Sequence, residues 1–133
     1  MSKVVLKNTQ TKAVVKVVSE NTTDITATDL SYTVKVESGD PAFGGVASKG
    51  LADRVQIPTR LEICRVIYSQ DDTHYVELKR GSDTVMVLGG SGDIDFEGQV
   101  CEHESSSTPI TVAASASGHK YTVYVFINKI GVA

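Results

Sequence analysis

The feature that most constrains the fold is a hydrophobic residue at every second position. The clearest runs are residues 31–37 (SYTVKVE), 73–80 (THYVELKR) and 120–128 (KYTVYVFIN). In the last run the odd-numbered positions are Tyr, Val, Val and Ile. Successive side chains of a strand point to opposite faces, whereas a helix repeats every 3.6 residues. The period of two therefore predicts β-strands.

Further runs are rich in β-branched residues, which suit the pleated surface of a sheet. They are residues 12–18, 59–69, 83–88 and 109–115. Polar and glycine-containing turns separate the runs, and seven to nine short strands are expected. This layout predicts an all-β fold, an antiparallel β-sandwich of the jelly-roll or Ig-like type. The 133 residues fit one domain, residues 1–133, which can bury roughly two thirds of its unfolded surface.

One segment breaks the rhythm, residues 38–60. It carries four of the eleven glycines and two of the three prolines, and no sustained period. We predict a long, irregular, Gly-rich loop within the domain, in which residues 47–55 have room for a short helical turn. Such loops are usually functional or flexible. Two interpretations stay open: a surface loop folded on its own sheet, or a loop ordered by a partner protein. The apolar residues that would dock in the second case are Phe43, Val46, Leu51 and Val55.

Residues 93–104 (DIDFEGQVCEHE) resemble a calcium-binding loop, with acids at positions 1, 3 and 5, Gly at 6 and Glu at 12. Such a loop needs a helix on each side, and the glycine-, serine- and proline-rich flanks do not form one. We therefore predict a strand, with Ile94 and Phe96 facing the core. The alternative is a non-helical cation site made by Asp93, Asp95 and Glu97. Since these carboxylates repel one another, solvent, a nearby Lys or Arg, or a basic partner must offset them.

Motifs that would carry catalysis or bind a cofactor are incomplete. Residues 88–93 (LGGSGD) lack the Lys of a P-loop, the third Gly of a dinucleotide fingerprint and the last Gly of a nucleophile elbow. We interpret them as a turn between two strands, and RGSD (residues 80–83) as a hairpin turn. The three histidines have no catalytic context. The sequence predicts no enzyme activity, no catalytic residues and no cofactor.

The cysteines do not form a disulfide framework or a complete zinc site. The chain has two, Cys64 and Cys101. Only Cys101 and His103 form a close pair of zinc ligands, and a zinc site needs about four ligands. We expect free thiols and no metal, with one bond between Cys64 and Cys101 as the alternative.

Composition argues against nucleic-acid and membrane partners. The net charge is −3, and no basic run exceeds Lys79-Arg80. The first twelve residues lack the apolar core of a secretory signal, and no apolar run approaches the ~20 residues that span a bilayer. The chain has no Trp and five Tyr, so a sugar site would have to stack on a tyrosine.

Three segments together resemble small virion structural proteins of tailed bacteriophages, especially those of marine hosts. They are residues 3–18, residues 65–96 and residues 119–131. The middle one has their charged strand, polar turn, apolar strand and Gly-rich turn into a short strand. The resemblance covers most of the chain outside residues 38–60. It implies a non-enzymatic capsid decoration or cement, neck or tail component, made in the host cytoplasm and located in the virion.

The partners implied by this resemblance are other virion proteins, such as the major capsid protein or neck or tail subunits, and further copies of the chain. Adjacent valines at 14–15 and 17–18, and Tyr124 and Phe126 opposite Val123, place apolar residues on both strand faces. One small sandwich cannot easily bury both. We therefore predict that a sheet face and residues 38–60 contact neighbouring subunits. The alternative is a receptor- or glycan-binding module on the same particle.

Overall fold

The computed structural model describes residues 3–19, 22–37, 51–96 and 108–131, in which regular structure is almost entirely β. Its elements are β1 (Lys3–Asn8), β2 (Lys12–Ser19), β3 (Thr23–Ile25), the 3₁₀ turn η1 (Thr28–Leu30), β4 (Tyr32–Glu37), β5 (Leu51–Gln56), β6 (Arg60–Gln70), β7 (Tyr75–Arg80), β8 (Asp83–Gly89), β9 (Gly92–Asp95), β10 (Ile110–Ala114) and β11 (Tyr121–Ile130). The described part thus holds more strands than the seven to nine expected. The additional ones include the exposed β1 and β5, whose sequences carry no burial pattern.

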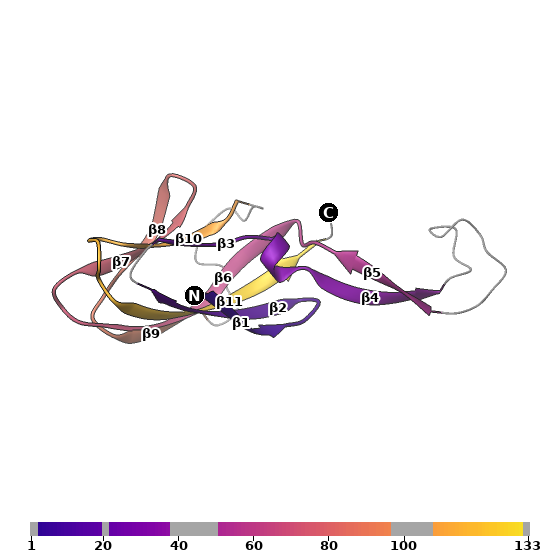
Figure 1. The fold of residues 1–133 in the computed structure, drawn as a ribbon, viewed down its shortest axis with the longest axis horizontal. Helices are drawn as coiled ribbons and strands as arrows, with labels where there is room; N and C mark the ends of the chain where they lie inside the picture. Colours follow the sequence, from indigo (N-terminus) through magenta and orange to yellow (C-terminus); the bar gives the residue numbers. More distant parts are fainter. Residues whose placement is uncertain (1–2, 20–21, 38–50, 97–107, 132–133) are drawn as a thin grey trace.

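Two antiparallel sheets form the body of the molecule. One has the order β1-β2-β11-β6-β9 and the other β3-β10-β7-β8. They lie as the lower and upper layers in Figure 1. The prediction of an all-β antiparallel sandwich is confirmed.

The strand order is that of a jelly roll. When β1 and the β4–β5 pair are set aside, eight strands remain. In chain order, the first, eighth, third and sixth form one sheet, and the second, seventh, fourth and fifth form the other. This is the arrangement of two Greek keys in a jelly roll, so of the two sandwich types considered, the structure has the first.

The core lies between the two sheets. In β11 the burial alternates strictly, with Val123, Val125 and Ile127 buried and the residues between them half-buried. Strand β2 behaves in the same way, because Val15 and Val17 point inward. The alternation seen in the sequence of these strands therefore marks the core face, as expected.

Two charged side chains also enter the interior. Arg80 is 8% exposed, and its Nη1 donates a hydrogen bond of 2.9 Å to the carbonyl oxygen of Leu61. Because Arg80 belongs to β7 and Leu61 to β6, this bond joins the two sheets. Lys129 on β11 is 5% exposed.

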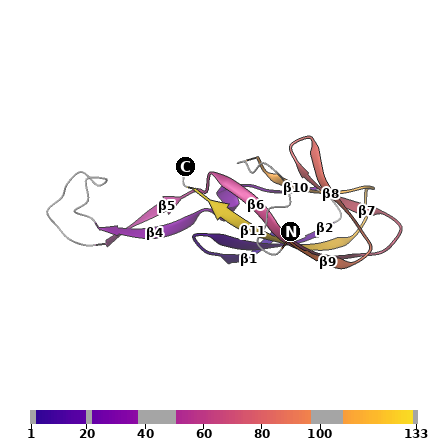
Figure 2. The same ribbon diagram turned by 180° about the vertical axis from the view of Figure 1, so that it is seen from behind.

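Strands β4 and β5 form a two-stranded ribbon of their own, which we call the arm. They pair in register from Tyr32 opposite Gln56 to Glu37 opposite Leu51. The arm extends from one end of the body along the long axis (Figures 1 and 2). It is an insertion between the second and third strands of the jelly roll.

The arm corrects part of the prediction for residues 38–60. Residues 38–50 lie outside the described residues. Leu51–Gln56, however, form a strand, not an irregular loop or a helical turn, and Arg60 already begins β6. Hydrogen bonds to β4 define this strand rather than burial on a core, so its sequence carries no clear alternation.

Both predicted short turns are confirmed. Strand β7 ends at Arg80 and β8 begins at Asp83, with Gly81 at a φ of 61°. Strand β8 ends at Gly89 and β9 begins at Gly92, with Gly90 at a φ of 67°. Glycine adopts positive φ without steric cost. The first turn joins the paired strands β7 and β8 as a hairpin, and the second leads from β8 in one sheet to β9 in the other.

Candidate interaction surfaces

The solvent side of the five-stranded sheet is the first candidate surface, and we call it the outer face. Strand pairing aligns its side chains in rows across the sheet. Three of these rows are Val4, Lys16, Tyr124, Ile67 and Asp93; Lys7, Val14, Phe126, Arg65 and Asp95; and Lys12, Asn128 and Glu62. The centre of the face is therefore aromatic and aliphatic, and its two edges are charged.

Cations lie over both aromatic rings of this face. Lys16 Nζ is 5.7 Å from the ring centroid of Tyr124, and the guanidinium of Arg65 is 5.3 Å from that of Phe126. Tyr124, Phe126, Ile67 and Val14 are half-buried although no described strand or helix lies on that side (Figure 1). The long side chains of Lys16 and Arg65 lie against the two rings and cover part of their apolar surface.

The stretch that resembles a calcium loop is a strand at the edge of this face. Residues Gly92–Asp95 form β9, paired with β6, so the strand prediction is confirmed for these residues. Ile94 is half-buried and packs against the core as expected. Glu97 lies outside the described residues.

An arginine offsets the carboxylates of β9. Arg65 donates two hydrogen bonds to Asp93, from Nε at 2.9 Å and from Nη2 at 2.6 Å. These bonds lower the pKa of Asp93 below its usual value. The nearby Arg is one of the three compensations that the sequence suggested, and it occupies both oxygens of the first carboxylate that a cation site would use.

Cys64 lies at a bulge in β6 and is a free thiol. Its Sγ donates to the carbonyl oxygen of Phe126 at 3.3 Å, and burial raises the pKa of the thiol. A raised pKa disfavours the reactive thiolate. Cys101 and His103 lie outside the described residues.

The second candidate surface is the arm, whose root is firmly attached to the body. Leu30, just before β4, is fully buried. Asn8 Nδ2 donates to the carbonyl oxygen of Ser31 at 2.8 Å. Thr59, after β5, donates from both its backbone N and its Oγ1 to the carbonyl oxygen of Ile130, at 3.1 and 2.9 Å. The arm therefore leaves the body in a defined direction.

Tyr32 and Lys129 form the central contact at this root. Lys129 Nζ is 4.5 Å from the ring centroid of Tyr32. The same ammonium donates to Asn8 Oδ1, and to the carbonyl oxygen of Thr9 at 2.6 Å. Burial lowers the pKa of Lys129 to about 8. A partly desolvated cation over a ring is worth about 2 kcal/mol, which helps to fix the orientation of the arm.

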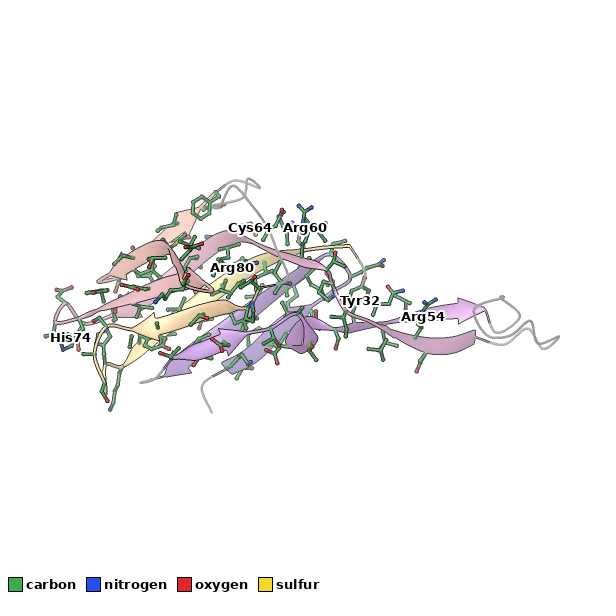
Figure 3. All side chains as sticks on the ribbon, turned by 90° about the horizontal axis from the view of Figure 1, so that it is seen from above. Tyr32, Arg54, Arg60, Cys64, His74 and Arg80 are labelled. Atoms are coloured by element: carbon green, nitrogen blue, oxygen red, sulfur yellow. The ribbon has the colours of Figure 1, made fainter. Side chains whose placement is uncertain are left out.

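Farther along β5, residues 53–55 of the arm are exposed. Val55 is 66% exposed, the most exposed large apolar residue in the described part of the chain. Arg54 and Asp53 beside it are also exposed. Figure 3 shows Arg54 on the arm, well away from the body. Of the four predicted docking residues, Val55 is thus accessible. Phe43 and Val46 lie outside the described residues, and only the backbone position of Leu51 in β5 is described.

A histidine pair at the opposite end of the body was not predicted from the sequence. The rings of His74 and His119 meet edge to face, with centroids 5.4 Å apart. His119 Nε2 is 2.5 Å from Gln70 Oε1, and its Nδ1 is 3.7 Å from Asp71 Oδ1. His74 follows a turn rather than lying in β7 as its spacing suggested. The turn connecting β10 to β11 brings His119 to it, and no local sequence signal could have shown this.

The tyrosines do not gather at one site. Tyr121 is buried in the core, and Tyr68 packs against the core. Tyr124 lies on the outer face, Tyr32 at the root of the arm, and Tyr75 is 43% exposed at the start of β7. The rim of tyrosines expected for a sugar site is therefore not formed by these residues.

Comparisons with known proteins give no relatives. No family model, curated protein or solved structure matches this chain. Among the described residues, no three His, Cys, Asp or Glu side chains come together so that they could hold a metal ion. The described part also has no helix with the length and apolar character to cross a membrane.

Proposed function

We propose that this chain is a non-enzymatic structural protein of a tailed-bacteriophage particle, a capsid decoration protein or another assembly component that docks on neighbouring virion proteins. The arm is the observation that carries this proposal. Among the described strands, β4 and β5 pair only with each other and extend away from the body.

The arm is the part of the molecule that most requires a partner. A two-stranded ribbon is at best marginally stable in water without a third strand or a covering layer. Its root is held by the body, but Val55 remains exposed farther along. Docking of the arm into a groove of a neighbouring subunit would bury this apolar surface and add hydrogen bonds at the strand edges.

The jelly roll is compatible with this proposal and with its main alternative. Viral capsid proteins and lectins both use the fold, and a fold alone does not define a function. The dispersed tyrosines give no specific support to the receptor- or glycan-binding alternative. The resemblance to virion proteins and the projecting arm together favour assembly.

The test uses matched substitutions on the arm and on the body. Val55→Asp places a charge on the arm, and Val87→Asp places the same charge on β8 of the body, where Val87 is 57% exposed. Both positions are exposed, so each change should alter the free energy of unfolding by about 0.5 kcal/mol or less.

Occupancy of purified phage particles is then measured for each variant by quantitative mass spectrometry. We expect wild-type protein and Val87→Asp at full occupancy, and a loss of at least tenfold for Val55→Asp. Absence of the wild-type protein from the particle would refute the virion role. Full occupancy of Val55→Asp would refute docking through the arm.

A further inference from the structure

We infer that the outer face is a self-association surface on which a second copy of this chain stacks about a two-fold axis parallel to the strands. The inference goes beyond a role in the particle, because it concerns the isolated protein. It rests on three properties of the outer face: its apolar centre, its size and the opposite charges of its two edges.

The apolar centre is formed by adjacent strands. Tyr124 and Phe126 lie on β11, the middle strand of the sheet, with Ile67 and Val14 beside them. Val18 and Val4, farther toward the β1 edge, are 47% and 50% exposed. Surfaces of this kind, with aromatic residues in the centre and a polar rim, are typical of protein interfaces.

The face is large enough for a dimer. Five strands at the usual spacing of about 4.8 Å, and about ten residues long in the middle, give a face on the order of 700 Å². A partner in a stable complex contributes about 800 Å². The remaining contact area would come from the adjacent loops and from the side chains that project above the sheet.

The charges of the two edges are opposite in sign. On the outer face, strands β1 and β2 carry Lys7, Lys12 and Lys16 and no carboxylate. Strands β6 and β9 carry three carboxylates there, on Glu62, Asp93 and Asp95, and two arginines, Arg60 and Arg65. The first edge therefore has a formal charge of +3, and the second has 2 − 3 = −1.

A two-fold axis parallel to the strands and over β11 brings these edges together. This rotation places each row of side chains opposite the same row of the second copy, in reverse order. The β1 edge of one copy therefore lies above the β9 edge of the other. Lys7 then faces Asp95 of the second copy, Lys12 faces Glu62, and the aromatic residues of β11 meet their own equivalents. A two-fold axis perpendicular to the strands would instead place lysines on lysines, which opposes that arrangement. Stacked sheets usually cross at about 30°, so this alignment is approximate.

The test is a charge swap at Lys12 and Glu62. Each single reversal, Lys12→Glu or Glu62→Lys, places like charges opposite each other at two symmetric positions of the dimer. We expect each to raise the dimer dissociation constant at least tenfold. The double variant Lys12→Glu/Glu62→Lys restores opposite charges and should recover most of the affinity.

The control is Lys79→Glu, the same change on β7 in the four-stranded sheet, which should leave the dissociation constant unchanged. The readout is the mass of the isolated protein by light scattering after size exclusion, between about 1 and 100 µM, with circular dichroism to verify folding. A monomer throughout this range overturns the inference. A dimer whose dissociation constant does not change with the single reversals would place the interface elsewhere and would also overturn the inference. The same holds if the double variant dimerises as weakly as the single variants.

Discussion

Burial separates valines that look alike in the sequence. Val125 on β11 is fully buried, whereas Val87 on β8 is 57% exposed. Val125→Ala removes two buried methyl-sized groups and leaves a small cavity, so the free energy of unfolding should fall by about 2 kcal/mol. Val87→Ala should change it by no more than about 0.5 kcal/mol. Urea unfolding of both variants checks this, and equal effects would mean that the two sheets enclose no core at Val125.

Lys129 should make stability depend on pH. Burial lowers its pKa to about 8 in the folded protein, against 10.5 for the ordinary group. Between these values the unfolded chain binds more protons than the folded one, so the free energy of unfolding should rise with pH from about 8 to 10.5. Below pH 8 both states are charged and the full cost of burying the ammonium applies.

The variant Lys129→Met isolates this effect. It keeps a long, unbranched side chain, one atom shorter than that of Lys, and removes the titrating group. The difference in stability between wild type and variant, measured by urea unfolding at pH 7.5 and 9.5, should shift in favour of the wild type at the higher pH. Parallel changes in the two proteins would contradict the burial of the Lys129 ammonium.

At the residue scale, alternation in the sequence predicted the buried valines of β2 and β11. It did not predict that the side chains of Arg80 and Lys129 are buried. Oxygens that accept hydrogen bonds from these two side chains belong to Leu61, Asn8 and Thr9, which are distant in sequence. A pattern of hydrophobicity contains no information about such partners, so charged residues are assigned to the surface by default.

The arm and the body should differ in local stability. Strand β11 is flanked by β2 and β6, whereas β4 and β5 pair only with each other among the strands that the structure describes. Backbone amides that are paired in the body open with nearly the full free energy of unfolding, and those of a lone ribbon open far more readily. In the isolated protein, amides of β4 and β5 should therefore exchange at least a hundredfold faster than those of β11.

Hydrogen exchange followed by mass spectrometry measures this difference. Arm amides that are as protected as those of β11 would show that the arm is already covered in solution, and that it does not need a partner. The strand pairs of β4 near Tyr32 should be the slowest in the arm, because the contact with Lys129 lies there.

At the element scale, strands that line the core and strand β4 were predictable, but β5 and the pairing of β4 with β5 into the arm were not. Tyr32, Val34 and Val36 alternate with polar residues, as in a half-buried strand, yet β4 belongs to the ribbon. Strand β5 carries Asp53 and Arg54 next to Val55 and shows no clear period. The alternation in β4 therefore predicted a strand but not its place in a ribbon, and β5 offered no alternation from which to predict one.

At the scale of the whole molecule, the class of fold followed from the number of strands and turns, but the pairing did not. Strand β2 pairs with β11, and β3 pairs with β10, across most of the chain. Local sequence determines neither pair. The outer face has the same origin, since its rows combine residues from five strands. Only the apolar residues on both sides of β2 and β11 indicated that one sheet face would need a cover.

The proposed assembly role is tested most directly by a cryo-EM reconstruction of the phage particle at a resolution that traces strands. We predict density for the jelly roll at a regular position on the particle, with the β4–β5 arm inserted against a neighbouring subunit and Val55 buried in that contact. Density in which the arm extends freely into solvent at full occupancy, or a particle that lacks the protein, would contradict the assembly role.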